Sequence, residues 1–164
     1  DSVTAAAALS AGACLAGVRV CKCTSVEEVV LREERGSPRV SGLVVNSSPV
    51  EQAGLHVDPL TIGAKFVIEA TGHALEVAHT LVRKNGVRLD TPSGGVQGEQ
   101  SLWAERAESD TVHNTREVFP GVYVAGMAAN ACHGSYRMGP VFGGMLLSGL
   151  HVARTISARL GGGA

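Results

Sequence analysis

Two histidines and one aspartate form a candidate metal site in this 164-residue sequence. His56 and Asp58 are two residues apart, so on an extended segment both side chains leave from the same face. His73 follows directly after an apolar run that predicts a buried strand. A carboxylate with one or two imidazoles suits a divalent iron, cobalt or zinc ion that keeps positions open for substrate. The alternative is a turn-forming Asp58 and two histidines with ordinary packing roles.

A second group of candidates, His133 and Arg137, lies in a glycine-rich loop between a short strand predicted at 122–125 and a helix predicted to begin near Pro140. Such a loop can hold an anion, because free backbone N–H groups and the helix dipole point at it. Arg137 could clamp a carboxylate or phosphate, or tie down its own loop. His133 is a candidate acid or base, although loop histidines more often serve neither purpose.

The elements that would position these residues alternate between helix and strand. The sequence predicts helices at 3–16, 74–84 and 140–160 and strands at 18–23, 25–31, 39–45, 64–70, 112–118 and 122–125. The strand at 64–70 reads as buried on both faces, and 85–98 reads as a loop. The last helix is expected to place one apolar face inward: Phe142, Met145, Leu146, Gly149, Ala153, Ile156 and Leu160. Strands separated by helices, with an antiparallel insertion, favour an α/β fold around a mostly parallel sheet.

The composition fits a single domain over residues 1–164 and excludes several classes of function. The hydrophobic fraction of 45% is enough for a core. A net charge of −1 without a polybasic run argues against nucleic-acid binding. No apolar run reaches the roughly 18 residues of a membrane span. Four cysteines, at 14, 21, 23 and 132, form no C-x-x-C pair and favour a reducing cytoplasm.

The sequence lacks the glycine motif of a dinucleotide-binding half. A Rossmann half normally opens with a strand, G-x-G-x-x-G and a helix. Before the terminal glycine run at 161–163, the glycine pairs lie in a predicted loop (94–95) and in the last predicted helix (143–144). The chain starts without Met, at an Asp1 that looks like a helix N-cap. We therefore expect the carboxyl-terminal portion of a larger dinucleotide-binding domain, with its amino-terminal dinucleotide-binding segment missing.

Several stretches together closely resemble the thiamine thiazole synthases. They are AGLHVDPLT at 53–61, ATGH at 70–73, VAGM at 124–127, HGSYRMGP at 133–140 and FGGM at 142–145. The resemblance implies a glutathione-reductase-type FAD/NAD-binding, Rossmann-like fold with an antiparallel β insertion. It also implies an enzyme that builds an adenylated thiazole, the thiazole precursor of thiamine, from NAD, glycine and a sulfur source.

The resemblance assigns the metal and the carboxylate of glycine to particular residues. Asp58 and His73 match Fe(II) ligands that come from neighbouring protomers, so the site would require a homo-oligomer. Arg137 matches the residue that binds the carboxylate of glycine.

The resemblance also implies which residues contact NAD. His56, Val57 and Asp58 match the segment that touches the dinucleotide, and Met127 matches another dinucleotide contact. Val26, which is aligned less securely, matches an adenine-side backbone contact.

His56 is also the catalytic position that implies the source of sulfur. Relatives that sacrifice their own sulfur place a cysteine there, whereas relatives that use free sulfide place a histidine. A histidine cannot donate sulfur, so the resemblance implies a sulfide-dependent enzyme that turns over many times. Bound iron would activate sulfide as bound metals activate water. Cys132 stands where a plain apolar residue is expected, which leaves a second sulfur source open.

Two other interpretations remain open. The segments ATG at 70–72 and YVAG at 123–126 also look like motifs of the wider flavoprotein superfamily, which would make the protein an FAD-dependent oxidoreductase. Met127 stands where those enzymes usually have an acidic residue, so this interpretation ranks lower. The 164-residue chain taken alone could also be an inactive dinucleotide-binding fragment.

Overall fold

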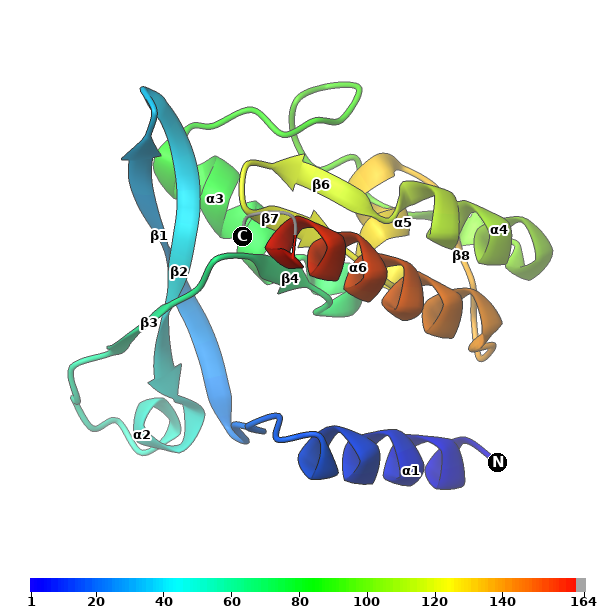
Figure 1. The fold of residues 1–164 in the computed structure, drawn as a ribbon, viewed down its shortest axis with the longest axis horizontal. Coiled ribbons are helices and arrows are strands. Elements are labelled where there is room, and N and C mark those ends of the chain that lie inside the picture. The colour runs from blue at the N-terminus through cyan, green and yellow to red at the C-terminus, as the bar shows by residue number, and fades with distance from the viewer. Residues whose placement is uncertain (162–164) are drawn as a thin grey trace.

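The computed structural model describes residues 1–161. A three-stranded antiparallel sheet in the order β1-β2-β3 stands along one side of the molecule (Figure 1). Its strands are β1 (Thr24–Glu34), β2 (Ser37–Ser47) and β3 (Leu60–Gly63). Helix α1 (Ser2–Leu15) precedes this sheet, and the short helix α2 (Ser48–Gln52) follows β2.

A second, mixed sheet has the order β4-β7-β6. Its strands are β4 (Val67–Glu69), β6 (Arg116–Phe119) and β7 (Val122–Val124). Strands β4 and β7 run parallel, whereas β6 pairs antiparallel with β7. The remaining helices are the 3-10 turn η1 (Gly72–Ala74), α3 (Glu76–Asn85), α4 (Ala104–Asn114), α5 (Met127–His133) and α6 (Gly143–Gly161). Strands β5 (Gln100–Leu102) and β8 (Tyr136–Arg137) form a small parallel pair.

The two larger sheets meet at the turn between β6 and β7. The backbone N–H of Val40 donates to the carbonyl oxygen of Pro120 at 2.9 Å. The backbone N–H of Val67 donates to the carbonyl oxygen of Gly121 at 2.8 Å. Gly121 has a φ of +88°, and a Cβ there would lie 2.4 Å from the carbonyl oxygen of Val40. Only glycine therefore fits this junction. One apolar cluster runs continuously from Val40 through β7 to α3 and α5.

The structure confirms the α/β class and the antiparallel insertion. The predicted helix at 3–16 is α1, which Asp1 caps by accepting from the N–H of Thr4 at 2.8 Å. The strands predicted at 25–31 and 39–45 lie within β1 and β2, and the helix predicted at 74–84 corresponds mainly to α3. Because β6 pairs antiparallel with β7, the β4-β7-β6 sheet is parallel only between β4 and β7, and the one other parallel pair within residues 1–161 is the small β5–β8 pair, so the expectation of a mostly parallel sheet was wrong.

Several predicted elements were wrong, mainly where long-range pairing decides the outcome. Residues 18–23 are irregular, because Val18 and Val20 are exposed and pair with no strand within residues 1–161. The strand predicted at 64–70 is only β4, and Ile68 on it is exposed, so the strand is not buried on both faces. The strand predicted at 112–118 is the end of α4 followed by β6.

The last helix begins later than predicted and turns a different face inward. Helix α6 starts at Gly143 and buries Gly144, Ser148 and Val152, whereas Phe142 and Leu146 are exposed. Small residues occupy the buried face because α6 lies close to α4. A Cβ on Gly144 would be 2.7 Å from the carbonyl oxygen of Glu108. Within the described residues, no helix combines the length and apolarity that a bilayer crossing requires.

Candidate active site

His73 lies in the turn that connects β4 to α3, at the carboxyl end of a parallel strand. The turn is held by Glu69, which is fully buried. Its two carboxylate oxygens accept from the N–H groups of Thr71 at 2.8 Å and Val77 at 2.6 Å. A carboxylate at the start of a helix is favoured by both the free N–H groups and the helix dipole. Glu69 therefore fixes the backbone that carries His73.

The ring nitrogen Nδ1 of His73 is buried and has no hydrogen-bond partner within residues 1–161. The nearest carboxylate oxygen of Glu99 is 3.7 Å away, which is beyond hydrogen-bonding distance. A buried polar atom without a partner needs an explanation such as a bound ion or water. This orphaned Nδ1 faces the carboxylate of Glu99, so the ring nitrogen of His73 that fits a metal ligand is Nε2.

His56 and Asp58 lie together in the loop between α2 and β3, with Val57 exposed between them. Nε2 of His56 is 3.7 Å from a carboxylate oxygen of Asp58, and the two side chains are 94% and 98% exposed. This loop is at the α2 end of the antiparallel sheet (Figure 1). Residues 1–161 contain no cluster of three or more His, Cys, Asp or Glu side chains that could hold a metal. His56 and Asp58 are thus brought together, but His73 does not join them within one chain.

Val26 is connected to this loop through the antiparallel sheet. It pairs with Val45 on β2, which in turn pairs with Leu60 at the start of β3. Val26 also lines a cavity of about 450 Å³ that extends to Ala74, the residue after His73, and to the amino-terminal part of α3. The residue predicted to lie on the adenine side therefore borders a cleft that reaches the turn carrying His73.

Met127 and Arg137 lie on the elements that follow β7, helix α5 and strand β8. Met127 begins α5 directly after β7, and α5 packs against η1. The structure thus places Met127 and His73 at the carboxyl ends of two paired parallel strands, where open α/β sheets collect ligands. Arg137 on β8 is exposed, and its guanidinium makes no hydrogen bond or ion pair within residues 1–161. An anionic group can therefore reach it.

His133 has a structural role in this chain. Its Nδ1 is 3.0 Å from the carbonyl oxygen of Ala129, and its Nε2 accepts from Nε of Arg116 at 3.1 Å. These contacts fit a neutral ring with the proton on Nδ1. Burial is the main cause that lowers the pKa of His133 below its ordinary value. With both nitrogens occupied, His133 is not placed to act as an acid or base.

Cys132 is buried in α5, next to the predicted site. Burial, reinforced by the negative charge of Glu69, raises the pKa of the Cys132 thiol to about 11. The thiol therefore stays protonated at neutral pH, and a thiol in that state is a poor nucleophile. Cys132 therefore acts as a small buried residue and is a poor second sulfur source.

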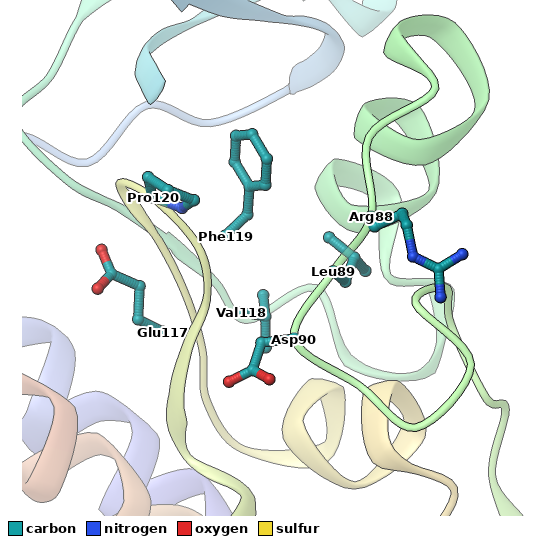
Figure 2. Close-up of a pocket in the computed structure, with 7 residues that line it drawn as sticks. All are labelled: Arg88, Leu89, Asp90, Glu117, Val118, Phe119 and Pro120. Carbon is teal, nitrogen blue, oxygen red and sulfur yellow. The ribbon is translucent and has the colours of Figure 1, made fainter. Parts of the chain in front are cut away.

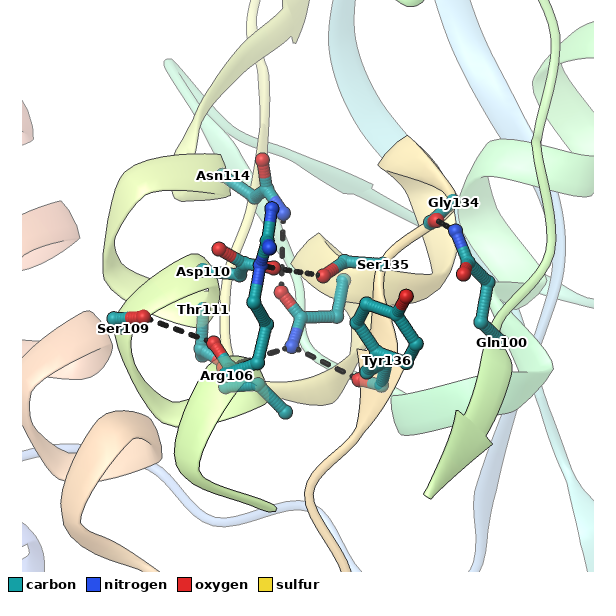
Figure 3. Close-up of polar contacts among 11 residues, drawn as sticks. Gln100, Arg106, Ser109, Asp110, Thr111, Asn114, Gly134, Ser135 and Tyr136 are labelled. Carbon is teal, nitrogen blue, oxygen red and sulfur yellow. Dashed lines mark hydrogen bonds and ion pairs between the residues drawn. The ribbon is translucent and has the colours of Figure 1, made fainter. Parts of the chain in front are cut away.

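The polar network around Asn130 was not predicted. Asn130 is fully buried and donates to the carbonyl oxygen of Ala107 and the hydroxyl of Thr111, at 3.0 and 2.8 Å. It also donates to the carbonyl of Tyr136 and accepts from Asn114. Figure 3 shows Thr111 and Asn114 of α4 on the side that faces Ser135 and Tyr136. The network ties α5 and β8 to α4, so it sets the positions of Met127 and Arg137; the only sequence signal was one amide in the apolar run MAANAC.

Another cavity, of about 410 Å³, lies between residues 88–90 and residues 117–120. Figure 2 shows Asp90 and Glu117 at this cavity, with the guanidinium of Arg88 extending toward the neighbouring loop. None of the candidate metal, dinucleotide or glycine residues lines it. This cavity is therefore separate from the candidate active site.

Comparisons with known proteins agree with one another. The sequence profile of the Thi4 family matches residues 1–142. The chain is 66% identical over 162 residues to a thiamine thiazole synthase of Solidesulfovibrio magneticus, covering 99% of this chain and 62% of that protein. It is 51% identical over 160 residues to a thiamine thiazole synthase of Methanothermobacter thermautotrophicus, covering 98% of this chain and 60% of that protein.

A solved structure shows the same similarity in three dimensions. The crystal structure of Thermovibrio ammonificans THI4 superimposes with a TM-score of 0.94 at 53% sequence identity. The match covers 98% of this chain and 62% of that one. The chain thus spans about three fifths of the length of the relatives that it matches.

Proposed function

The chain belongs to the Thi4 family, and on that premise we propose that the protein is a sulfide-dependent, iron-dependent ADP-thiazole synthase. It makes the thiazole precursor of thiamine from NAD, glycine and sulfide. The observation that carries this proposal is His73, a half-buried imidazole whose ring makes no hydrogen bond within residues 1–161, at the edge of the sheet where α5 begins. Relatives that are 51–66% identical carry the name thiamine thiazole synthase.

The proposed fold is of the glutathione-reductase type, with residues 1–164 as the carboxyl-terminal portion of the dinucleotide-binding domain. Two features support it: the parallel β4–β7 pair followed by turns at its carboxyl ends, and the antiparallel sheet inserted before it. In this arrangement NAD would contact Val26 on its adenine side, the segment from His56 to Asp58, and Met127.

We propose that Asp58 and His73 hold Fe(II) and that the two ligands come from different protomers of a homo-oligomer. The near-complete exposure of Asp58, and its separation from His73 within one chain, support a shared site. Bound Fe(II) would supply a Lewis acid that keeps sulfide ionised at neutral pH. Asp58 contributes a negative charge and His73 a neutral nitrogen, a donor set that suits this ion.

Two further side chains determine which substrates react. Arg137 presents a planar guanidinium that can bind the carboxylate of glycine through two parallel hydrogen bonds. Nε2 of His56 is 3.7 Å from a carboxylate oxygen of the proposed iron ligand Asp58, which would put the imidazole at the reacting centre. An imidazole has no sulfur to give, so sulfur enters as free sulfide and the enzyme can turn over. The raised pKa of Cys132 supports the same conclusion.

The experiment uses the protein at its full natural length, incubated without oxygen with NAD, glycine, sulfide and Fe(II). We expect mass spectrometry to detect an adenylated thiazole in excess of one equivalent per protein, and only when sulfide is present. Folded protein that forms no such product would refute the proposal. Product limited to one equivalent without sulfide would refute the sulfide-dependent part. Flavin absorbance in the purified protein would instead favour an FAD-dependent oxidoreductase.

We also propose that the enzyme works in a reducing cytoplasm. All four cysteines are free, and three of them, Cys14, Cys21 and Cys23, are exposed. Exposed thiols persist unpaired where the cellular thiol pool is reduced. Detection of the native protein in a cytoplasmic fraction would support this location.

A further inference from the structure

On the basis of the proposed function, which makes His73 a metal ligand, we propose that Glu99 is the positioning residue of His73. Its carboxylate accepts a hydrogen bond from the Nδ1–H of the imidazole. This leaves Nε2 as the nitrogen that binds the metal. No family motif noted in the sequence includes Glu99, and it belongs to a stretch that the sequence pattern assigns to the edge of a loop.

The first observation is the pairing of the two side chains. Oε1 of Glu99 is the carboxylate oxygen 3.7 Å from Nδ1 of His73, the same nitrogen that is buried without a hydrogen bond within residues 1–161. The side chains are 35% and 31% exposed, so water screens the pair only partly. A rotation that shortens the contact by roughly 0.7 Å would turn it into a hydrogen bond.

The second observation is that the backbone on both sides of Glu99 is anchored. The backbone N–H of Gln97 donates to the carbonyl oxygen of Cys132 at 3.2 Å. The backbone N–H of Gln100 donates to the carbonyl oxygen of Ser135 at 2.8 Å. The side-chain amide of Gln100 adds a bond to the carbonyl of Gly134 at 2.6 Å. A carboxylate held between two such anchors can orient a neighbouring ring, because little conformational entropy remains to be lost.

The third observation links Glu99 to the other half of the site. Strand β5 begins at the next residue and pairs parallel with β8, where Leu102 lies opposite Arg137. His73 is anchored separately, through Glu69 and the start of α3. Glu99 therefore joins the turn that carries the metal ligand to the strand pair that carries the arginine.

The chemistry of metal-bound histidine explains what the pair would do. A histidine ligand usually donates its second N–H to a carboxylate or carbonyl, which fixes the tautomer and the ring orientation and raises the basicity of the ligating nitrogen. Losing such a partner typically costs about 10- to 100-fold in metal affinity. A surface ion pair without this role would have almost no effect on metal binding.

The test measures Co(II) binding to the protein at its full natural length, without oxygen, from the visible absorption bands of the bound ion. We expect Glu99→Ala to weaken Co(II) binding by about 10- to 100-fold. Glu99→Gln keeps an oxygen that can accept the Nδ1–H, so its affinity should stay within about 10-fold of the unmodified protein, with unchanged absorption bands. Glu105→Ala removes an exposed glutamate on α4 and serves as the matched control.

The outcomes separate this proposal from the proposed function. Unchanged Co(II) affinity in Glu99→Ala, alongside weakened binding in His73→Ala, would overturn the role of Glu99 alone. Altered absorption bands in Glu99→Gln would make Glu99 a direct ligand and would also overturn the positioning role. If His73→Ala binds Co(II) as tightly as the unmodified protein, the metal site itself is wrong and both proposals fail. Glu99→Gln keeps the test decisive if Glu99→Ala does not fold.

Discussion

Two histidines of this chain have opposite surroundings, and that difference identifies the one suited to chemistry. His133 uses both ring nitrogens, one with the carbonyl of Ala129 and one with Arg116. His73 leaves a buried nitrogen without a partner. An imidazole whose two nitrogens are both hydrogen-bonded can only stabilise the fold. An imidazole with a nitrogen that lacks a partner can receive a ligand or a second partner. Sequence spacing alone treated both residues as candidates.

His133 should make the stability of the fold depend on pH in the mildly acidic range. Because its pKa is lowered in the folded state, the unfolded state takes up the proton first, near pH 6.5. The stability that it contributes is complete above that pH and is lost as the pH falls, by at most about 1.4 kcal/mol per pH unit. We expect His133→Gln to reduce this slope, measured by urea unfolding between pH 7.5 and 5.

The exposed His151 on α6 provides the matched control. His151→Gln should leave the slope of unfolding free energy against pH unchanged. An equal slope in His133→Gln and the unmodified protein would contradict the assignment of a half-buried, neutral His133.

Helix α6 shows how small residues can outweigh large ones in deciding which face of a helix is buried. Ser148 lies on the buried face, where its hydroxyl is 2.6 Å from that of Thr115 and accepts from the N–H of Gly126 at 2.8 Å. Gly144 allows the backbone of α4 to come close. The helix therefore links α4 to the start of α5, and its leucines Leu146, Leu147 and Leu150 stay on the outside.

A pair of glycine substitutions in α6 tests this packing. Gly144→Ala places a Cβ 2.7 Å from the carbonyl oxygen of Glu108, so α4 must move, and we expect the free energy of unfolding to fall by about 1–3 kcal/mol. Gly149→Ala meets no atom within 4 Å and should raise that free energy by up to about 1 kcal/mol, because alanine is the better helix former. Urea denaturation of both variants provides the measurement. Equal effects of the two changes would contradict the packing of α6 against α4.

The candidate residues form two groups that one chain does not unite. His56 and Asp58 are exposed at the α2 end of the antiparallel sheet. His73 and Met127 lie at the carboxyl ends of β4 and β7, and Arg137 follows on β8. Under the proposed function the site needs both groups, so it would be complete only in an association of two copies, the arrangement that cyclic homo-oligomers provide.

A mixing experiment tests the shared site. Asp58→Ala and His73→Ala, each at full natural length, should both be inactive alone. If the ligands come from different protomers, unfolding and refolding the two variants together creates mixed pairs in which one site has both native ligands. For random pairing we expect about a quarter of the native activity, measured as ADP-thiazole formed. Continued inactivity of a properly assembled mixture would place both ligands in the same protomer.

The sequence alone determined the features that depend on near neighbours. Asp1 caps α1, the strands predicted at 25–31 and 39–45 lie within the antiparallel pair β1 and β2, and motif residues such as His73 and Arg137 follow predicted strands. These features need only local propensity, periodicity and a family motif, all of which can be read along the chain. They were sufficient to indicate the α/β class and most of the candidate residues.

Only the tertiary structure decided the features that depend on contacts between distant residues. It showed that Val18 and Val20 find no strand partner within residues 1–161, that Gly144 rather than Phe142 faces α4, and that His73 lies beside Glu99. The physical reason is that burial, strand pairing and an unsatisfied nitrogen are properties of pairs of segments. A linear sequence lists the members of such pairs but does not say which of them meet.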